Sequence, residues 1–353
     1  MILVTGGAGF IGSNLVYALN QRSIDRIIIV DHLGTGDKWK NLRGLKFEDY
    51  LEKDDFEKYY LKGTKAIPEL TTVFHIGACS NTTETNCSYL VENNYRFSKL
   101  LLDFSVSYNA RLIYASSAAT YGNGVICHSA KEYNGNILLE EDLKTKFTDN
   151  EIYIEKLKPL NMYGYSKHMF DLVLKRTDSF RKFKIVGLKY FNVFGANEYH
   201  KSHMKSFILK SYEQILQKGY ATVFYQDGNI EKANDLYRDF IYIKDAINMT
   251  LYFYDNPRLF GLFNIGSGVA TGWEYLTNLL IEVGKQYFQT LKISPKINYI
   301  PIPNELKDQY QYKTIADISS VRNVGYREQI TPIKKAVANY LNEYLIPNKY
   351  ITD

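Results

Sequence analysis

Met1-Ile2-Leu3-Val4-Thr5-Gly6-Gly7-Ala8-Gly9-Phe10-Ile11-Gly12 opens the chain, and in it an apolar run passes directly into glycines spaced three residues apart. The run 2–5 predicts a buried strand, and the periodic segment 10–20 predicts a helix. Gly6 permits the tight turn between them, Gly9 lets the main chain approach a pyrophosphate, and Gly12 lets the helix pack closely on the strand. Because the start of a helix presents unbonded N–H groups, this stretch predicts a dinucleotide site.

An acidic residue ends the second apolar run, 26–31. Asp31 stands where a carboxylate can accept hydrogen bonds from an adenosine ribose, a position that favours NAD over NADP. Lys38 and Lys53 follow and could neutralise a 2′-phosphate. These residues by themselves leave NAD and NADP both open.

The rest of the chain predicts an α/β fold with a Rossmann-type, doubly wound parallel sheet. Further apolar runs at 72–77, 111–115, 185–190 and 262–266 predict strands, and helical periodicity covers 88–108 and 161–176. Residues 1–190 are expected to form the dinucleotide-binding domain, to which the chain returns at about 239–268. Segments 191–238 and 269–353, with helices at 204–217 and 271–287, are expected to form a smaller α/β substrate-binding domain. The turn-rich region 123–158 is expected to be a surface insertion.

Composition excludes several classes of protein. The chain has 353 residues and a net charge of +5, and its basic residues are scattered among acids, so nucleic-acid binding is not indicated. Its 3 cysteines have no metal-ligand spacing and do not suggest a disulfide framework, which favours a reducing cytoplasm and no bound metal. No export signal or apolar stretch long enough to span a bilayer is evident.

Candidate catalytic residues follow two of the predicted elements. Ser117 stands just beyond the strand 111–115, at the carboxyl edge where ligands of such sheets bind. Tyr163 and Lys167 are four residues apart in a predicted helix and therefore share one face. A phenol of ordinary pKa is a poor base, but a neighbouring ammonium and an oxidised nicotinamide stabilise its phenolate. Together these residues predict proton exchange with a sugar hydroxyl, coupled to hydride transfer.

These motifs resemble those of the extended short-chain dehydrogenases, and more narrowly those of the heptose epimerases that act on an ADP-linked sugar. Besides the opening run, the resemblance covers nearly the whole chain and includes the stretches 74–80, 114–122, 190–195, 238–242 and 263–268. The run Gly77-Ala78-Cys79-Ser80 followed by Thr82-Thr83-Glu84, and the segment around Lys201, resemble the heptose epimerases in particular.

The resemblance implies an NADP-dependent inversion at C6 of an ADP-heptose through a transient ketone. It places a second acid/base group at Lys201, beside Tyr163, Lys167 and Ser117. It also implies a nucleotide-sugar precursor pathway for lipopolysaccharide, a cytoplasmic location and a homopentamer. The implied cofactor contacts are Gly6, Gly9, Phe10, Ile11, Gly12, Asp31, His32, Lys38, Lys53, Ile76, Gly77, Ala78, Cys79, Ser80, Asn93, Lys167 and Val193. The implied substrate contacts are Ser117, Asn192, His203, Lys210, Tyr225, Gln226, Asp227, Gly228, Arg238 and Tyr310.

Two positions depart from the pattern of the heptose epimerases. Ala196-Asn197 replaces a usual Pro-Arg pair, and Ser202-His203 replaces a usual Gly-Ser pair; both are expected to border the sugar pocket. An epimerase acting at C4 of a hexose, or one acting on a GDP-heptose, is therefore an alternative. A 4,6-dehydratase is disfavoured, because Ala118-Ala119-Thr120 offers no carboxylic acid to protonate a leaving hydroxyl. A cofactor-sensing protein without catalysis is a further alternative, against which Ser117, Tyr163 and Lys167 argue.

Overall fold

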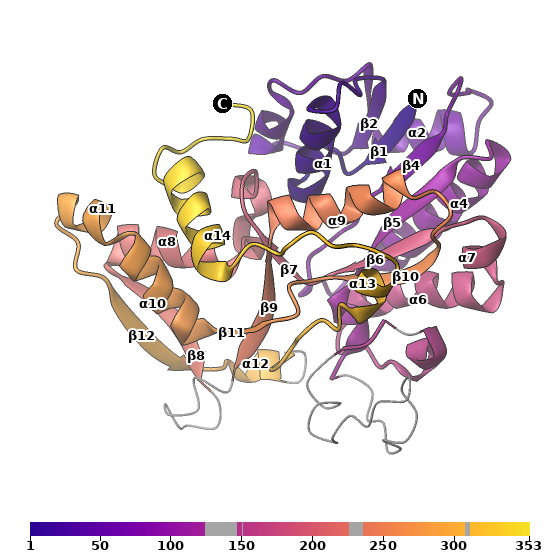
Figure 1. The fold of residues 1–353 in the computed structure, drawn as a ribbon. Coiled ribbons are helices and arrows are strands. Elements are labelled where there is room, and N and C mark those ends of the chain that lie inside the picture. Colours follow the sequence, from indigo (N-terminus) through magenta and orange to yellow (C-terminus); the bar gives the residue numbers. More distant parts are fainter. Residues whose placement is uncertain (124–146, 150, 226–235, 308–310) are drawn as a thin grey trace.

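The computed structural model describes residues 1–123, 147–149, 151–225, 236–307 and 311–353 (Figure 1). The predicted doubly wound parallel sheet is confirmed. Seven strands lie in the order β10-β6-β5-β4-β1-β2-β3, and each neighbouring pair is parallel. Their bounds are β1 Ile2–Thr5, β2 Ile27–Asp31, β3 Asp49–Glu52, β4 Thr72–His75, β5 Arg111–Ser117, β6 Val186–Tyr190 and β10 Gly261–Ile265. The short edge strand β3 was not predicted, because its four residues are exposed or half-buried and form no apolar run.

Helices cover both faces of this sheet, as apolar residues on both sides of each strand require. On one face lie α1 Phe10–Asn20 and α9 Ile243–Asp255, which contact each other (Figure 1). The other face carries α2 Lys53–Phe56, α4 Phe97–Ser107 and α6 Met162–Arg176. The short helices α3 Cys87–Leu90 and α7 Ser179–Lys182 flank α4 and α6.

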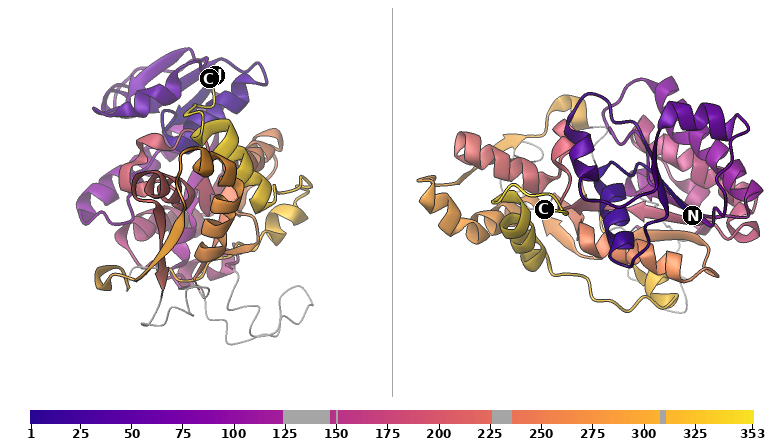
Figure 2. Two further views of the ribbon diagram at one scale, coloured as in Figure 1. Left: turned by 90° about the vertical axis from the view of Figure 1, so that its left-hand side faces the viewer. Right: turned by 90° about the horizontal axis from the view of Figure 1, so that it is seen from above.

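A second lobe lies beside the large sheet (Figures 1 and 2). Its helices α8 and α10 lie on the side away from the large sheet (Figure 1). It contains a three-stranded sheet in the order β11-β9-β7 and a two-stranded sheet of β12 and β8. The strands are β7 Asn192–Phe194, β8 Tyr220–Tyr225, β9 Tyr237–Tyr242, β11 Ala270–Gly272 and β12 Lys296–Pro301. The helices are α8 Phe207–Lys218, α10 Trp273–Val283, α11 Lys285–Thr290, α12 Asn304–Lys307 and α14 Ile333–Tyr340. The short helix α13 Ser319–Asn323 instead contacts β10 of the large sheet (Figure 1).

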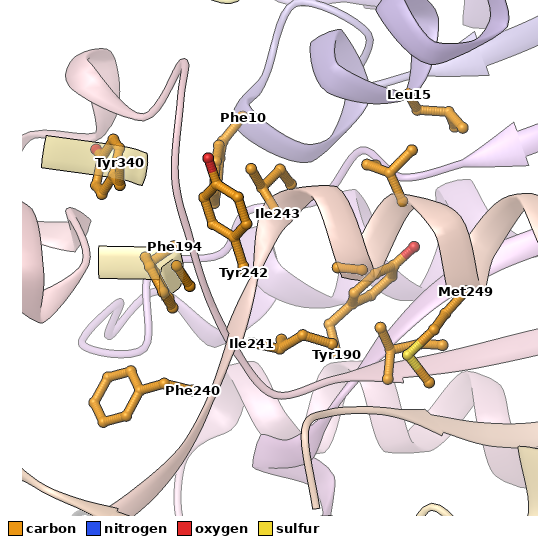
Figure 3. Close-up of a cluster of buried hydrophobic side chains, with 14 of the residues drawn as sticks. Phe10, Leu15, Tyr190, Phe194, Phe240, Ile241, Tyr242, Ile243, Met249 and Tyr340 are labelled. Carbon is orange, nitrogen blue, oxygen red and sulfur yellow. The ribbon is translucent and has the colours of Figure 1, made fainter. Parts of the chain in front are cut away.

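One buried apolar cluster runs without interruption from the large sheet into the second lobe (Figure 3). Phe10 at the start of α1 contributes to it, as do Phe194 of β7, Phe240 of β9 and Tyr340 of α14. All four side chains are at most 6% exposed. The two lobes therefore share one close-packed core. This core holds the elements of the two lobes in fixed positions relative to one another.

Two predicted helices have different bounds in the structure. The helix predicted at 204–217 begins at Phe207, because Ser206 caps α8 by accepting the N–H of Leu209, and it ends before Gly219, whose φ is +77°. The helix predicted at 271–287 is divided into α10 and α11 at Gly284. Glycine interrupts both patterns where helical periodicity alone continues.

The predicted insertion 123–158 lies partly outside the described residues. Its C-terminal part is described and is packed into the protein: Phe147 is 6% exposed and stacks on Tyr121. Asp149 is also buried and accepts hydrogen bonds from Asn264 and Ser320. Over the described part of the chain, no helix is both long and apolar enough to cross a membrane.

Candidate active site

The glycine turn joins β1 to α1 as its spacing predicts. Gly6 has a φ of +71°, and a side chain at Gly12 would bring a Cβ to within 2.1 Å of the Gly6 carbonyl oxygen. No side chain caps the first turn of α1. Gly9, Phe10, Ile11 and Gly12 line a cavity of about 510 Å³. Unbonded N–H groups and a partial positive charge at this helix start suit a pyrophosphate.

Asp31 lies at the end of β2 beside this turn and is 7% exposed. Its carboxylate accepts hydrogen bonds from the Ala8 N–H at 2.8 Å and the His32 N–H at 2.7 Å, and it pairs with the Lys38 ammonium. A smaller cavity of about 180 Å³ is lined by Asp31, His32, Lys38, Lys53 and, from the helical segment Val91–Arg96, Asn93. Asp31 is the one carboxylate among the described residues that line this cavity, and Lys53 pairs instead with Glu57 at 3.9 Å. The residues present therefore fit the adenosine end of a nicotinamide dinucleotide.

The loop after β4, with Ile76, Gly77, Ala78, Cys79 and Ser80, lines the larger cavity. Asn94 fixes this loop: its side chain accepts the Cys79 N–H at 2.8 Å and donates to the Cys79 carbonyl at 3.0 Å. The same amide donates to Ser166 of α6. Asn94 was not among the predicted residues, since its role depends on a fold contact that no motif marks.

Ser117, Tyr163 and Lys167 meet in the 510 Å³ cavity. Asn161 caps the start of α6 by accepting the Gly164 N–H at 2.8 Å, which places Tyr163 in the first turn of the helix and Lys167 one turn later. Burial raises the pKa of Tyr163, and its hydrogen bond with Ser117 opposes that rise. Burial lowers the pKa of Lys167 to about 8, against the attraction of Asp171. The fold thus brings the hydroxyl of Ser117 together with the phenol of Tyr163 and the ammonium of Lys167.

Lys201 lines the same cavity from a different element. It lies in the 3₁₀ segment Tyr199–Met204, which is kinked at Ser202, where φ is positive at 48° and ψ is −126°. The Lys201 ammonium nitrogen is 5.1 Å from the centre of the Phe10 ring. Burial lowers the pKa of Lys201, and the nearby Glu198 carboxylate opposes that effect. A lysine whose ammonium is destabilised in this way can exchange a proton closer to neutral pH.

Glu198 holds the segment that carries Lys201, although sequence reasoning did not find it. Its buried carboxylate accepts hydrogen bonds from the Ser206 hydroxyl at 2.7 Å and from the Tyr340 hydroxyl of α14 at 3.0 Å. Residues near 350 also reach this segment, because the Tyr199 hydroxyl donates to the carbonyls of Tyr344 and Lys349. The position of Lys201 therefore depends on residues about 140 positions further along the chain.

A third cavity, of about 760 Å³, adjoins the first and belongs mainly to the second lobe. Among the predicted substrate contacts, it is lined by Asn192, His203, Lys210 and Arg238. Phe207, Trp273 and Gln311 line it as well and were not predicted. Tyr225 ends β8, pairs with Pro301 and lines none of the three cavities. Gln226, Asp227, Gly228 and Tyr310 lie outside the described residues.

Only one of the two departures from the heptose-epimerase pattern lines the 510 Å³ cavity. Ser202 and His203 line the cavity with Tyr163, as expected. The expectation for Ala196-Asn197 is wrong: both residues are buried, and neither lines the cavity. The side-chain NH₂ of Asn197 donates to the Ser13 hydroxyl of α1, and its side-chain oxygen accepts the Ile351 N–H. Its φ of +74° explains an asparagine there, since this residue type tolerates the left-handed region. Val193 lines both larger cavities.

Comparison with known proteins gives a consistent family. Residues 2–266 match the NAD dependent epimerase/dehydratase family. The chain is 39% identical over 352 residues to the ADP-L-glycero-D-manno-heptose-6-epimerase of Nitratidesulfovibrio vulgaris, and 36% identical over 348 residues to that of Fusobacterium nucleatum; 98% of each chain is covered in both cases.

Solved structures show the same fold. The ADP-L-glycero-D-manno-heptose-6-epimerase of Helicobacter pylori matches with a TM-score of 0.71 at 23% identity, covering 97% of this chain and 95% of that one. The UDP-glucuronic acid 4-epimerase of Bacillus cereus, in complex with UDP-glucuronic acid and NAD, matches with a TM-score of 0.71 at 21% identity, covering 97% of this chain and 99% of that one. The chain belongs to the NAD dependent epimerase/dehydratase family of nicotinamide-dependent enzymes and, within it, to the group that contains the ADP-L-glycero-D-manno-heptose-6-epimerases.

Proposed function

We propose that this protein inverts C6 of ADP-D-glycero-β-D-manno-heptose, giving ADP-L-glycero-β-D-manno-heptose, with bound NADP. One observation carries the proposal: Tyr163 and Lys201 line a single cavity from two separate elements, α6 and the segment Tyr199–Met204. Inversion through a ketone needs proton transfer at both faces of one carbon, and two groups on different elements supply it. The names of the relatives at 36–39% identity support the same substrate.

In the proposed mechanism the chain's residues handle the proton and the geometry. The phenol oxygen of Tyr163 exchanges a proton with the C6 hydroxyl at one face, and the Lys201 amine does so at the other. Lys167 stabilises the Tyr163 phenolate as an ammonium, which it retains below about pH 8. Ser117 holds the sugar hydroxyl beside Tyr163. NADP, held by the glycine turn, Asp31 and Lys53, would supply the hydride chemistry at C6.

NADP is proposed over NAD on the charges beside Asp31. The adenosine cavity is lined by Lys38 and Lys53 against one carboxylate, an excess of positive charge that suits a 2′-phosphate. In the Lys53→Ala variant, the Kd for NADPH should rise about tenfold, or about 1.4 kcal/mol, while that for NADH changes little. Fluorescence titration of both cofactors measures this, with the exposed Lys58→Ala as control. Equal weakening of both cofactors would argue against NADP.

Incubation with ADP-D-glycero-β-D-manno-heptose tests the main proposal. NMR should show inversion at C6 without added cofactor beyond what the protein binds. Absence of conversion in a cofactor-loaded protein would overturn the proposed substrate, and conversion of a UDP-hexose at C4 would establish the alternative. The homopentamer implied by the resemblance stays a prediction that sedimentation velocity can check.

A further inference from the structure

A buried ion pair lies beneath the catalytic residues and takes no part in the mechanism proposed above. The Lys189 ammonium of β6 is 3.4 Å from an Asp171 carboxylate oxygen of α6, and the two side chains are 1% and 0% exposed. Removing two charges from water costs several kcal/mol per ion, and an apolar pair of similar volume is often at least as stable. Stability is therefore a weak explanation for this pair, and its neighbours indicate another.

Asp171 connects helix α6 to strand β5 through hydrogen bonds. One carboxylate oxygen accepts the Tyr114 hydroxyl at 2.7 Å, and the other accepts the Ser116 hydroxyl at 2.8 Å. Both donors are in β5, and Ser116 directly precedes Ser117. Asp171 itself is one helical turn after Lys167 on α6. A single carboxylate thus fixes the end of β5 against the helix that carries Tyr163 and Lys167.

Lys189 ties the turn after Ser117 to the same carboxylate. Its ammonium donates to the Thr120 hydroxyl at 2.7 Å, and that hydroxyl donates to the Ser117 carbonyl at 2.8 Å. The ammonium also lies 4.4 Å from the centre of the Tyr121 ring. The buried pair therefore holds the chain on both sides of Ser117. Asp171 of α6 binds Ser116 before it, and Lys189 of β6 binds Thr120 after it.

The charge on Asp171 also acts on Lys167. Lys167 shares α6 with Asp171 and Tyr163, and His75 of β4 faces it. His75 stays neutral, because burial holds its pKa well below the ordinary value. Asp171 is thus the acidic group that favours the Lys167 ammonium, whose pKa burial has lowered to about 8. A lysine that titrates so close to neutral pH is sensitive to the loss of one nearby negative charge.

We propose that Asp171 and Lys189 form a positioning pair, which sets Ser117 against Tyr163 and Lys167 and keeps Lys167 in its ammonium form. The inference rests on the roles given to these three residues in the proposed function. It does not depend on the identity of the sugar. Neither Asp171 nor Lys189 is assigned a contact with substrate or cofactor.

Two variants separate positioning from simple folding stability. Asp171→Asn removes the carboxylate charge but leaves Lys189 buried without its counter-ion. Asp171→Asn combined with Lys189→Met removes both charges at nearly constant volume, so its thermal midpoint should recover toward wild type. Asp245→Asn is the matched control, because Asp245 is a buried carboxylate that accepts two hydrogen bonds from Thr331, away from the cavities.

The first readout is the titration of Lys167, followed by NMR of ¹³C-labelled lysine and assigned by the signal lost in Lys167→Met. In both Asp171 variants Lys167 should titrate about one pH unit lower than in the wild type, and in Asp245→Asn its titration should not shift. This measurement needs no substrate, so failure of the proposed function leaves it intact. A wild-type titration in the double variant would overturn the electrostatic part of the proposal.

The second readout is turnover of the sugar that the wild type converts. Both Asp171 variants should lose at least about tenfold in kcat, with KM nearly unchanged, because the reacting groups lose alignment while substrate contacts remain. Their rate should also decline from a lower pH, as Lys167 loses its proton earlier. A double variant with recovered thermal stability and wild-type kcat would overturn positioning and leave the pair a structural feature only.

Discussion

Two elements bring Tyr163 and Lys201, the proposed proton-transfer groups, to the cavity, and they are stabilised in opposite ways. Helix α6 is regular: Asn161 caps its start, Lys175 and Arg176 occupy its last turn, and Tyr163 and Lys167 follow helical spacing. The segment Tyr199–Met204 is irregular, contains the left-handed Ser202 and depends on Glu198. A helix organises its own residues locally, whereas this segment is organised by contacts from α14 and beyond. The first kind of site can be recognised from spacing, and the second cannot.

The largest expected effect is that of Tyr163→Phe, which removes the phenol oxygen that helix α6 brings to the cavity. The rate of C6 inversion should fall about a thousandfold, within the range that positioned acid/base groups contribute. Tyr165→Phe is the control, because Tyr165 is two residues away on the same helix and 47% exposed. More than a tenth of the wild-type rate in Tyr163→Phe would contradict its assigned role.

Lys201→Met tests the irregular side and should lower the inversion rate about a hundredfold. Cofactor binding should persist, since the glycine turn and Asp31 are untouched. An epimerase with a single acid/base group would be little affected, so a wild-type rate would favour the C4 alternative. Lys218→Met, at the exposed end of α8, shows whether loss of any lysine matters.

Glu198→Gln tests whether the irregular segment depends on its buried carboxylate. One Glu198 oxygen accepts the hydroxyls of Ser206 and Tyr340, and the other accepts the Ser206 N–H. An amide has only one acceptor atom, so either the Ser206 N–H or both hydroxyls lose their acceptor. We expect about a tenfold lower inversion rate, or about 1.4 kcal/mol in the barrier. In a Lys201→Met background the same change should add almost nothing, and two independent losses would show that Glu198 acts elsewhere.

Ser202→Gly should have the smallest effect. Glycine adopts the left-handed region without steric cost, so the free energy of unfolding should increase by about 0.5–1 kcal/mol. Ser23→Gly, another serine with positive φ in an exposed turn, should give a similar gain in chemical denaturation. A rate change that accompanies Ser202→Gly alone would show that the geometry of this residue contributes to the position of Lys201.

Residues near the regular elements were predictable because their chemistry follows local patterns. The glycine turn, Asp31, Ser117 and the Tyr163–Lys167 pair each follow a strand or lie on a helix whose pattern is evident in the sequence. The parallel sheet follows from the same alternation, whereas its strand order was not predicted. The cavity brings these residues together as expected, although their roles stay predictions.

The remaining site residues could not be found locally. Asn94, Glu198 and Asp171 act through hydrogen bonds to residues 15, 142 and 55–57 positions away. Lys201 was identified only through the family resemblance, because a loop lysine carries no pattern of its own. Burial is what gives each of these polar residues its function, and burial depends on the complete fold. Asp171 alone offered a local signal, four residues after Lys167 on the same face of α6.

The contacts of Asn197 and Tyr199 with residues 344–351 have a consequence for biosynthesis. During translation the glycine turn, Asp31 and the helix with Tyr163 are complete once residue 176 has been made. The segment with Lys201 acquires its partners only when Tyr340, Tyr344 and Ile351 have followed. The segment with Lys201 therefore completes its contacts later in synthesis than the glycine turn and the helix with Tyr163.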